Sequence, residues 1–316
     1  MHSQTWGLIR EAIGNPKASL FNLLFLARNM PKVDDPSVLR NFALSLPHDI
    51  RKNYAEECAF LETMSLDDLA VVMFPYPTKS PGLENIEIPS GVENGFPYVM
   101  HNHRSKLYFQ RNTSISDMLS QYHILVDSEG LLGTGILMKS PHCYQDEDFR
   151  VEKGDVLLDV GCAEAIFALD NIDIVSKAYL FESLPEWRKP LRRTFAPYGD
   201  KVVLVNKLVS DKTSARSTTL SDAVKTDMGK DAHFFVKMDI EGWERLVIEG
   251  NDDFFTSSKV KLSCCVYHRQ DDAQIIEKML KQRGYNTRFS DGWMLVCLNG
   301  IHYPYFRHGI IYAQNY

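Results

Sequence analysis

The chain has 316 residues, of which 44% are hydrophobic and 24% charged, so it is long enough for two ordinary globular domains. Its formal net charge of −6 argues against broad nucleic-acid binding, because neutralising phosphates requires an excess of Lys and Arg. Six scattered cysteines form no CxxC pair, which disfavours a zinc cage or disulfide framework and favours the cytosol. The apolar run at residues 20–27 is shorter than the roughly 20 residues that a membrane span requires.

The first part of the chain, residues 1–140, is predicted to be a helical and loop region that covers the substrate. Leucines and isoleucines recur at spacings of three and four residues over much of residues 1–72, which is typical of amphipathic helices. Five prolines and three glycines in residues 73–98 predict a loop or linker without regular elements. Residues 99–150 carry no pattern that assigns them to helix or strand. The helical pattern rests on Leu8, Ile13, Leu20, Leu23, Leu24, Leu61, Leu66 and Leu69.

The second part, residues 141–316, has the pattern of an α/β domain. Apolar runs typical of strands alternate with helical segments, which predicts a Rossmann-like, doubly wound, mainly parallel sheet. Two last strands, with no helix between them, are expected to form an antiparallel pair at one sheet edge. The predicted strands are residues 156–160, 178–181, 202–205, 234–238, 260–267, 293–298 and 309–313. The predicted helices are residues 163–175, 185–195, 243–248 and 273–283.

A turn after the first of these strands has the features of a nucleotide-cofactor site. Asp159 ends the strand, and Gly161 lets the backbone approach a ligand at the start of a helix. Glu182 ends the next strand, 21 positions (182 − 161) after the glycine, where a carboxylate can bind both ribose hydroxyls. A dinucleotide enzyme would carry GxGxxG, but alanines occupy positions 163 and 165. These residues therefore disfavour a nicotinamide cofactor.

Further polar residues follow two later strands of the predicted sheet. Asp239 and Glu241 come after one strand, and His268 ends the next. Asp239 or Glu241 could simply cap the helix that follows, and a lone histidine is most often structural. In the usual strand order, however, Asp159, Asp239 and His268 line up at the carboxyl ends of three neighbouring strands, with Glu182 on the other side of Asp159. Four polar side chains are then expected at one crevice.

These motifs together resemble the FkbM-type methyltransferases of the Rossmann-like methyltransferase superfamily. The similarity rests on Asp159-Val160-Gly161, Phe181-Glu182, Tyr267-His268 and above all the K-x-D-x-E-G-x-E string at residues 237–244. It extends over about residues 141–316, including the closing segment 303–307, and leaves about the first 130 residues uncovered. The resemblance implies O-methylation of a hydroxyl on a sugar, glycan or other small molecule, with S-adenosylmethionine as the cofactor.

The resemblance also assigns roles to residues of the cofactor site. The turn after the first strand would hold the methionine part, Glu182 the ribose, and residues 208–210 the adenine edge. The family commonly has glycine where this chain has Ala165, which puts the tightness of the turn in doubt. The residues assigned to the cofactor are Asp159, Gly161, Cys162, Ala163, Glu182, Leu208, Val209, Ser210 and Asp239.

An alcohol must lose a proton to accept a methyl group, so a general base is expected. We expect His268 to be this base because the ordinary pKa of histidine lies near 6.5. Asp239 would orient cofactor or substrate, Glu241 would support His268 or replace it as the base, and no metal is expected. The acceptor is expected to be a small molecule or glycan. A catalytically silent cofactor-binding domain and, less favoured, a nicotinamide-dependent oxidoreductase stay open as alternatives.

Overall fold

The computed structural model describes residues 36–63, 74–77, 88–133, 139–229, 231–296 and 306–316. Several sequence predictions lie outside these residues: the apolar run 20–27, the leucine pattern of residues 8–24 with Leu66 and Leu69, and most of the closing segment 303–307. Within the described residues, no helix has both the length and the apolar character needed to cross a bilayer.

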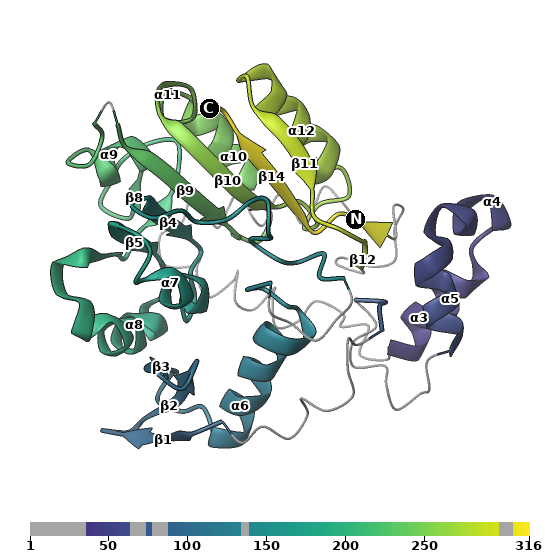
Figure 1. The fold of residues 1–316 in the computed structure, drawn as a ribbon, viewed down its shortest axis with the longest axis horizontal. Helices are drawn as coiled ribbons and strands as arrows, with labels where there is room; N and C mark the ends of the chain where they lie inside the picture. The colour runs from purple at the N-terminus through teal and green to yellow at the C-terminus, as the bar shows by residue number, and fades with distance from the viewer. Residues whose placement is uncertain (1–35, 64–73, 78–87, 134–138, 230, 297–305) are drawn as a thin grey trace.

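The α/β part of the molecule is built on a seven-stranded sheet with the order β11-β14-β10-β9-β4-β5-β6 (Figure 1). The five strands from β10 to β6 are parallel to one another, whereas β14 runs antiparallel to both β10 and β11. Because β4 lies between β5 and β9, the strand order changes direction at β4, as in doubly wound Rossmann-like sheets. The strands are β4 (Val156–Val160), β5 (Lys177–Phe181), β6 (Val202–Val205), β9 (His233–Met238), β10 (Lys259–Cys265), β11 (Asn286–Phe289) and β14 (Ile310–Gln314).

Helices cover both faces of this sheet, and for that reason the central strands are mostly apolar on both faces. Alternation along β4 places Leu157 in the core beneath α7 (Ile166–Asn171) and α8 (Arg188–Phe195), and Leu158 in the core on the opposite face. The opposite core is covered by α9 (Leu220–Val224), α10 (Glu244–Gly250), α11 (Asp252–Ser257) and α12 (Asp272–Gln282). The predicted fold class is confirmed, with the parallel strands and their helices close to the expected positions.

The antiparallel edge has different members from those predicted. β14 pairs with β11, whereas β12 (Met294–Leu295) leaves the main sheet and pairs with β13 (Phe306–Arg307). The sequence Asn-Thr-Arg-Phe of β11 is half exposed and polar, so it has no apolar run to reveal it. Leu295 and Phe306 instead pack against the N-terminal helices, next to which β12 lies in Figure 1.

The N-terminal region is helical in part, with α3 (Pro36–Ser45), α4 (His48–Arg51) and α5 (Ala55–Thr63). The prediction that residues 73–98 contain no regular element is wrong. An antiparallel sheet is formed by β1 (Ser90–Glu93), β2 (Phe96–His101) and β3 (Ser105–Tyr108). Asn94 and Gly95 both have positive φ and form the two-residue turn between β1 and β2, so this glycine starts a hairpin rather than a linker.

Candidate functional site

The turn after β4 requires a glycine at its first position. Gly161 has a φ of +77°, and a Cβ there would lie only 1.9 Å from the carbonyl oxygen of Asp239. Ala163 and Ala165 also have positive φ, of +45° and +61°. Alanine in this conformation costs roughly 1–2 kcal/mol. The turn therefore keeps the backbone shape of a glycine-rich cofactor loop despite its two alanines.

Glu182 lies beside this turn, as the strand order predicts. It follows β5, which pairs with β4, and is only 9% exposed. Its carboxylate accepts hydrogen bonds from the amides of Ala163 (3.1 Å) and Leu184 (2.7 Å). Each carboxylate oxygen has a further lone pair, so Glu182 can hold the turn and still accept hydrogen bonds from a ligand.

Asp159 and Lys237 form a buried ion pair beneath the turn. The two residues are paired in the register of β4 and β9, and Lys237 Nζ lies 3.2 Å from Asp159 Oδ1. The same ammonium donates a hydrogen bond of 2.8 Å to the carbonyl oxygen of Gly161. Burial opposes the charge on Lys237, but Asp159 and Asp239 raise its pKa above the ordinary value. Lys237 therefore stays protonated and fixes the turn from below.

Asp239 is an ionised carboxylate at the carboxyl end of β9. Tyr144 donates a hydrogen bond of 2.6 Å to its Oδ2, and His268 Nε2 lies 3.5 Å from its Oδ1. Burial acts to raise the pKa of Asp239, but His268, Lys237 and His142 outweigh burial and lower it to about 2. Asp239 is thus a fixed negative charge at neutral pH.

His268 is buried among carboxylates, and this changes its chemistry. Its Nδ1 lies 3.0 Å from Glu244 Oε1, and its Nε2 lies 3.5 Å from Asp239 Oδ1 and 3.6 Å from Glu241 Oε2. Burial alone would lower the pKa of His268, but Glu244, Asp239 and Glu241 raise it to about 9. The expectation of an ordinary histidine pKa is therefore wrong, because three acids stabilise the imidazolium.

The remaining predicted residues lie away from the enclosed part of the site. The side chain of Glu241 is 88% exposed. Leu208–Val209 form the short strand β7, paired with β8 (Ser217–Thr218), and Leu208 is 55% exposed. Ser210 follows β7, and its carbonyl oxygen accepts a hydrogen bond from Asn251.

A cavity of about 110 Å³ lies directly over the Gly161 turn. Residues at the ends of β4 and β9, in the turn and at the start of α7 form part of its lining, and the rest comes from segments before residue 145. Ligand pockets commonly measure roughly 300–1,000 Å³, so this cavity holds only part of a cofactor-sized molecule. The lining residues are Leu125, Glu129, Leu131, His142, Tyr144, Asp159, Gly161, Cys162, Ala163, Glu164, Ile166, Phe167, Lys237 and Asp239.

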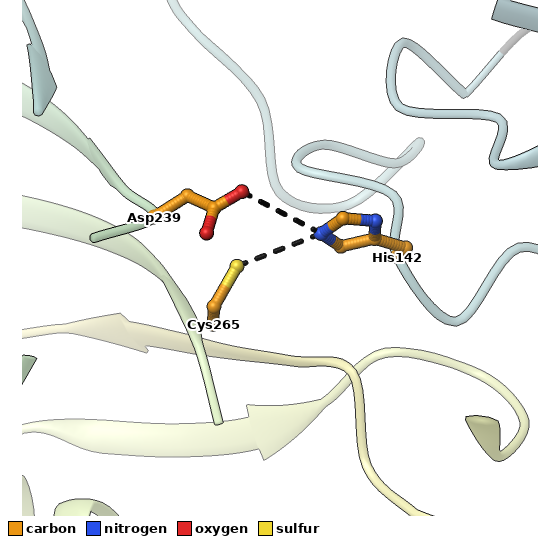
Figure 2. A group of neighbouring side chains, drawn as sticks. All are labelled: His142, Asp239 and Cys265. Atoms are coloured by element: carbon orange, nitrogen blue, oxygen red, sulfur yellow. Dashed lines mark hydrogen bonds and ion pairs between the residues drawn. The ribbon is translucent and has the colours of Figure 1, made fainter. Parts of the chain in front are cut away.

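Five polar side chains of this lining are absent from the predicted site. Glu164 and Lys237 belong to the motifs that the sequence singled out, whereas His142, Tyr144 and Glu129 lie before residue 145. Figure 2 shows His142 with Asp239 and Cys265. His142 Nε2 lies 3.8 Å from Asp239 Oδ2 and 3.6 Å from Cys265 Sγ. His142 and Tyr144 come from a segment without regular structure, and Glu129 directly follows a π-helix, η3 (Ile124–Ser128). No strand or helix pattern in the sequence therefore marks these three residues. The only sequence signal is a histidine and a tyrosine two residues apart shortly before the first strand of the α/β domain.

Two groups of side chains in the described residues have donor atoms close enough to share a metal ion. One group is His142, Asp239 and Cys265, and the other is Asp239, Glu241 and His268. In the first group, Asp239 Oδ2 already accepts a hydrogen bond from Tyr144. In the second group, His268 is held as an imidazolium, and only a neutral imidazole binds a metal.

Comparison with known proteins shows similarity to methyltransferases. FkbM from Methylobacillus flagellatus is 19% identical, with a TM-score of 0.40, and the alignment covers 52% of this chain and 44% of that one. A putative methyltransferase from Streptococcus mutans, solved in complex with SAH, is 12% identical, with a TM-score of 0.34, and the alignment covers 52% of this chain and 90% of that one. A putative RNA methyltransferase from Pyrococcus horikoshii is 12% identical, with a TM-score of 0.31, and the alignment covers 51% of this chain and 74% of that one.

No curated protein matches the chain. The aligned part spans less than half of the Methylobacillus protein. Residues 166–287 match the sequence model of the family described as the methyltransferase FkbM domain, which covers β5, β9 and β10 with the K-x-D-x-E-G-x-E string. Over residues 166–287 the chain therefore matches the methyltransferase FkbM domain, as its sequence motifs indicated.

Proposed function

We propose that this protein transfers a methyl group from S-adenosylmethionine to a hydroxyl oxygen. The observation that carries the proposal is the acidic cavity over the Gly161 turn. Four carboxyl groups line it, from Glu129, Asp159, Glu164 and Asp239, against a single ammonium, that of Lys237. S-adenosylmethionine carries an ammonium and a sulfonium, so this excess of acid is complementary to it.

Several features of the site fit the individual parts of this cofactor. We place the methionine part at Gly161, Cys162 and Ala163, and the ribose at Glu182. The adenine edge would lie against residues 208–210, outside the small cavity. Burial raises the pKa of Glu164 to about 7, and a cation bound nearby would favour its ionised form.

When bound, S-adenosylmethionine supplies an electrophilic methyl group. Asp239, held by Tyr144 and His268, is the residue that would orient this group and the acceptor. Most of the residues that line the cavity are buried, and the low local dielectric strengthens these electrostatic interactions. We infer a sugar, glycan or other small-molecule acceptor in the cytosol, since the net charge of −6 disfavours RNA.

Two alternatives are separated from this proposal by experiment. A silent cofactor-binding domain is favoured by the strained alanines of the turn, whereas a nicotinamide enzyme would need the missing glycines. Calorimetry with S-adenosylmethionine, S-adenosylhomocysteine and NAD should give binding of the first two only. A screen with labelled methyl donor over hydroxyl-bearing extracts should give a labelled ether. Binding without any labelled product would support the silent domain.

A further inference from the structure

The buried His142 and the partly buried Glu129 form a pair at the wall of the cavity. His142 Nδ1 lies 2.7 Å from Glu129 Oε2, and the two side chains are 6% and 22% exposed. Both residues line the cavity together with Asp239 and the Gly161 turn. A carboxylate on one ring nitrogen fixes the orientation of a histidine and determines which nitrogen carries the proton.

The contacts of His142 leave its second nitrogen available as a proton acceptor. Since Glu129 accepts the proton on Nδ1, the neutral ring has a lone pair on Nε2. Tyr144 Oη lies 3.3 Å from Nε2, but its proton is committed to Asp239 at 2.6 Å. The other neighbours are the Cys265 thiol at 3.6 Å, which is a weak donor, and Asp239 Oδ2 at 3.8 Å, which as a carboxylate oxygen has no proton to donate. A substrate hydroxyl would be a better donor to Nε2 than any of these groups.

His268 does not meet the same requirement. Its pKa of about 9 makes it an imidazolium at neutral pH, so it has no lone pair to offer. It is absent from the residues that line the cavity, whereas His142 is among them. The two histidines face the same carboxylate, Asp239, from opposite oxygens.

We propose that His142, oriented by Glu129, is the general base that accepts the proton of the acceptor hydroxyl. This inference rests on the proposed methyl transfer. The oxygen–methyl bond forms while the sulfur–methyl bond breaks, the electron pair of the broken bond stays on sulfur, and the hydroxyl proton moves to Nε2. Glu129 and Asp239, on either side of the ring, stabilise the imidazolium that results.

The first test reads the proton position without any acceptor. Long-range ¹H–¹⁵N spectra of the whole chain with labelled histidine, assigned by loss of the signal in His142→Gln, should show a proton on Nδ1 and a bare Nε2 at pH 8. Glu129→Gln should increase the Nε2–H form, whereas Asp127→Asn, beside His123, should leave the His142 signals unchanged. A dominant Nε2–H form in the parent protein, or no change in Glu129→Gln, would overturn the proposal.

The second test separates this inference from the proposed function. Titration of S-adenosylmethionine should shift the Nε2 signal of His142 as calorimetry records binding. Binding without a shift would refute His142 as the base while leaving the cofactor assignment intact. No binding at all would refute the proposed function itself.

The third test uses a hydroxyl acceptor from the labelled-methyl screen. His142→Gln should lower kcat by about 100- to 10,000-fold, the usual contribution of a general base, with the KM for S-adenosylmethionine within a few-fold. His123→Gln is the matched control, because His123 also pairs with a carboxylate (2.6 Å from Asp127) but does not line the cavity. An unchanged kcat in His142→Gln, or an equal loss in His123→Gln, would contradict the assignment.

Discussion

The close approach of Gly161 to the end of β9 predicts a specific cost for adding one methyl group. In Gly161→Ala the new Cβ would meet the carbonyl oxygen of Asp239 at 1.9 Å and Ile240 Cγ2 at 2.9 Å. Backbone strain at positive φ costs roughly 1–2 kcal/mol and overpacking adds about 1–3 kcal/mol. We therefore expect a loss of about 2–5 kcal/mol in the free energy of unfolding.

Gly284→Ala is the matched control for this substitution. Its φ of +82° is close to the +77° of Gly161, but no atom lies within 4 Å of the added Cβ, so only the strain remains. Urea denaturation followed by circular dichroism measures both variants. Gly161→Ala should be the less stable of the two by at least about 1 kcal/mol and should also bind S-adenosylmethionine more weakly. Equal stability would refute the close approach that shapes the turn.

Three further predictions concern charges and metals at the site. The folded-state pKa of His268 is about 9 and the ordinary value is 6.5, so the stabilisation that its charge provides is complete below pH 6.5 and is lost as the pH rises through 9. The difference in free energy of unfolding between the parent protein and His268→Gln should therefore shrink over that pH range. A difference that stays constant would contradict the raised pKa. Lys237→Met should lower the free energy of unfolding by about 3–5 kcal/mol because it leaves Asp159 buried without its partner. Lys177→Met, which breaks the partly exposed pair with Asp227, should lower it by less than about 1 kcal/mol. Similar losses for the two variants in urea denaturation would contradict this prediction. Dialysis against a chelator should leave methyl transfer unchanged, and activity restored by added magnesium would show a required metal.

The sequence predicts the fold where local pattern and burial agree. The parallel strands are mostly apolar because both faces are covered, so they stand out as runs. β1 and β11 have no such run, the run of β2 contains Pro97, and only the Asn94–Gly95 turn marks the hairpin. Pairing across the sheet edge depends on contacts between distant segments, which periodicity does not report.

In the site, too, some residues are predictable from strand order and others depend on contacts between distant segments. Asp159, Glu182 and Asp239 lie at the carboxyl ends of strands whose order is a general property of doubly wound sheets, so their convergence is predictable. The pKa of His268 depends on Glu244, a buried acid in α10, and no spacing rule reveals that contact. His142 lies in a segment without regular structure, and its position over the turn is set by tertiary packing alone.

The central claim is that the Gly161 turn and Glu182 bind S-adenosylmethionine. Calorimetric titration of the parent protein, Glu182→Ala and the exposed control Glu186→Ala tests this most directly. Charge-assisted hydrogen bonds contribute roughly 1.5–3 kcal/mol, so Glu182→Ala should weaken binding at least about tenfold, with Glu186→Ala unchanged and NAD not bound. Absence of binding to the parent protein, or full affinity in a folded Glu182→Ala variant, would contradict the account.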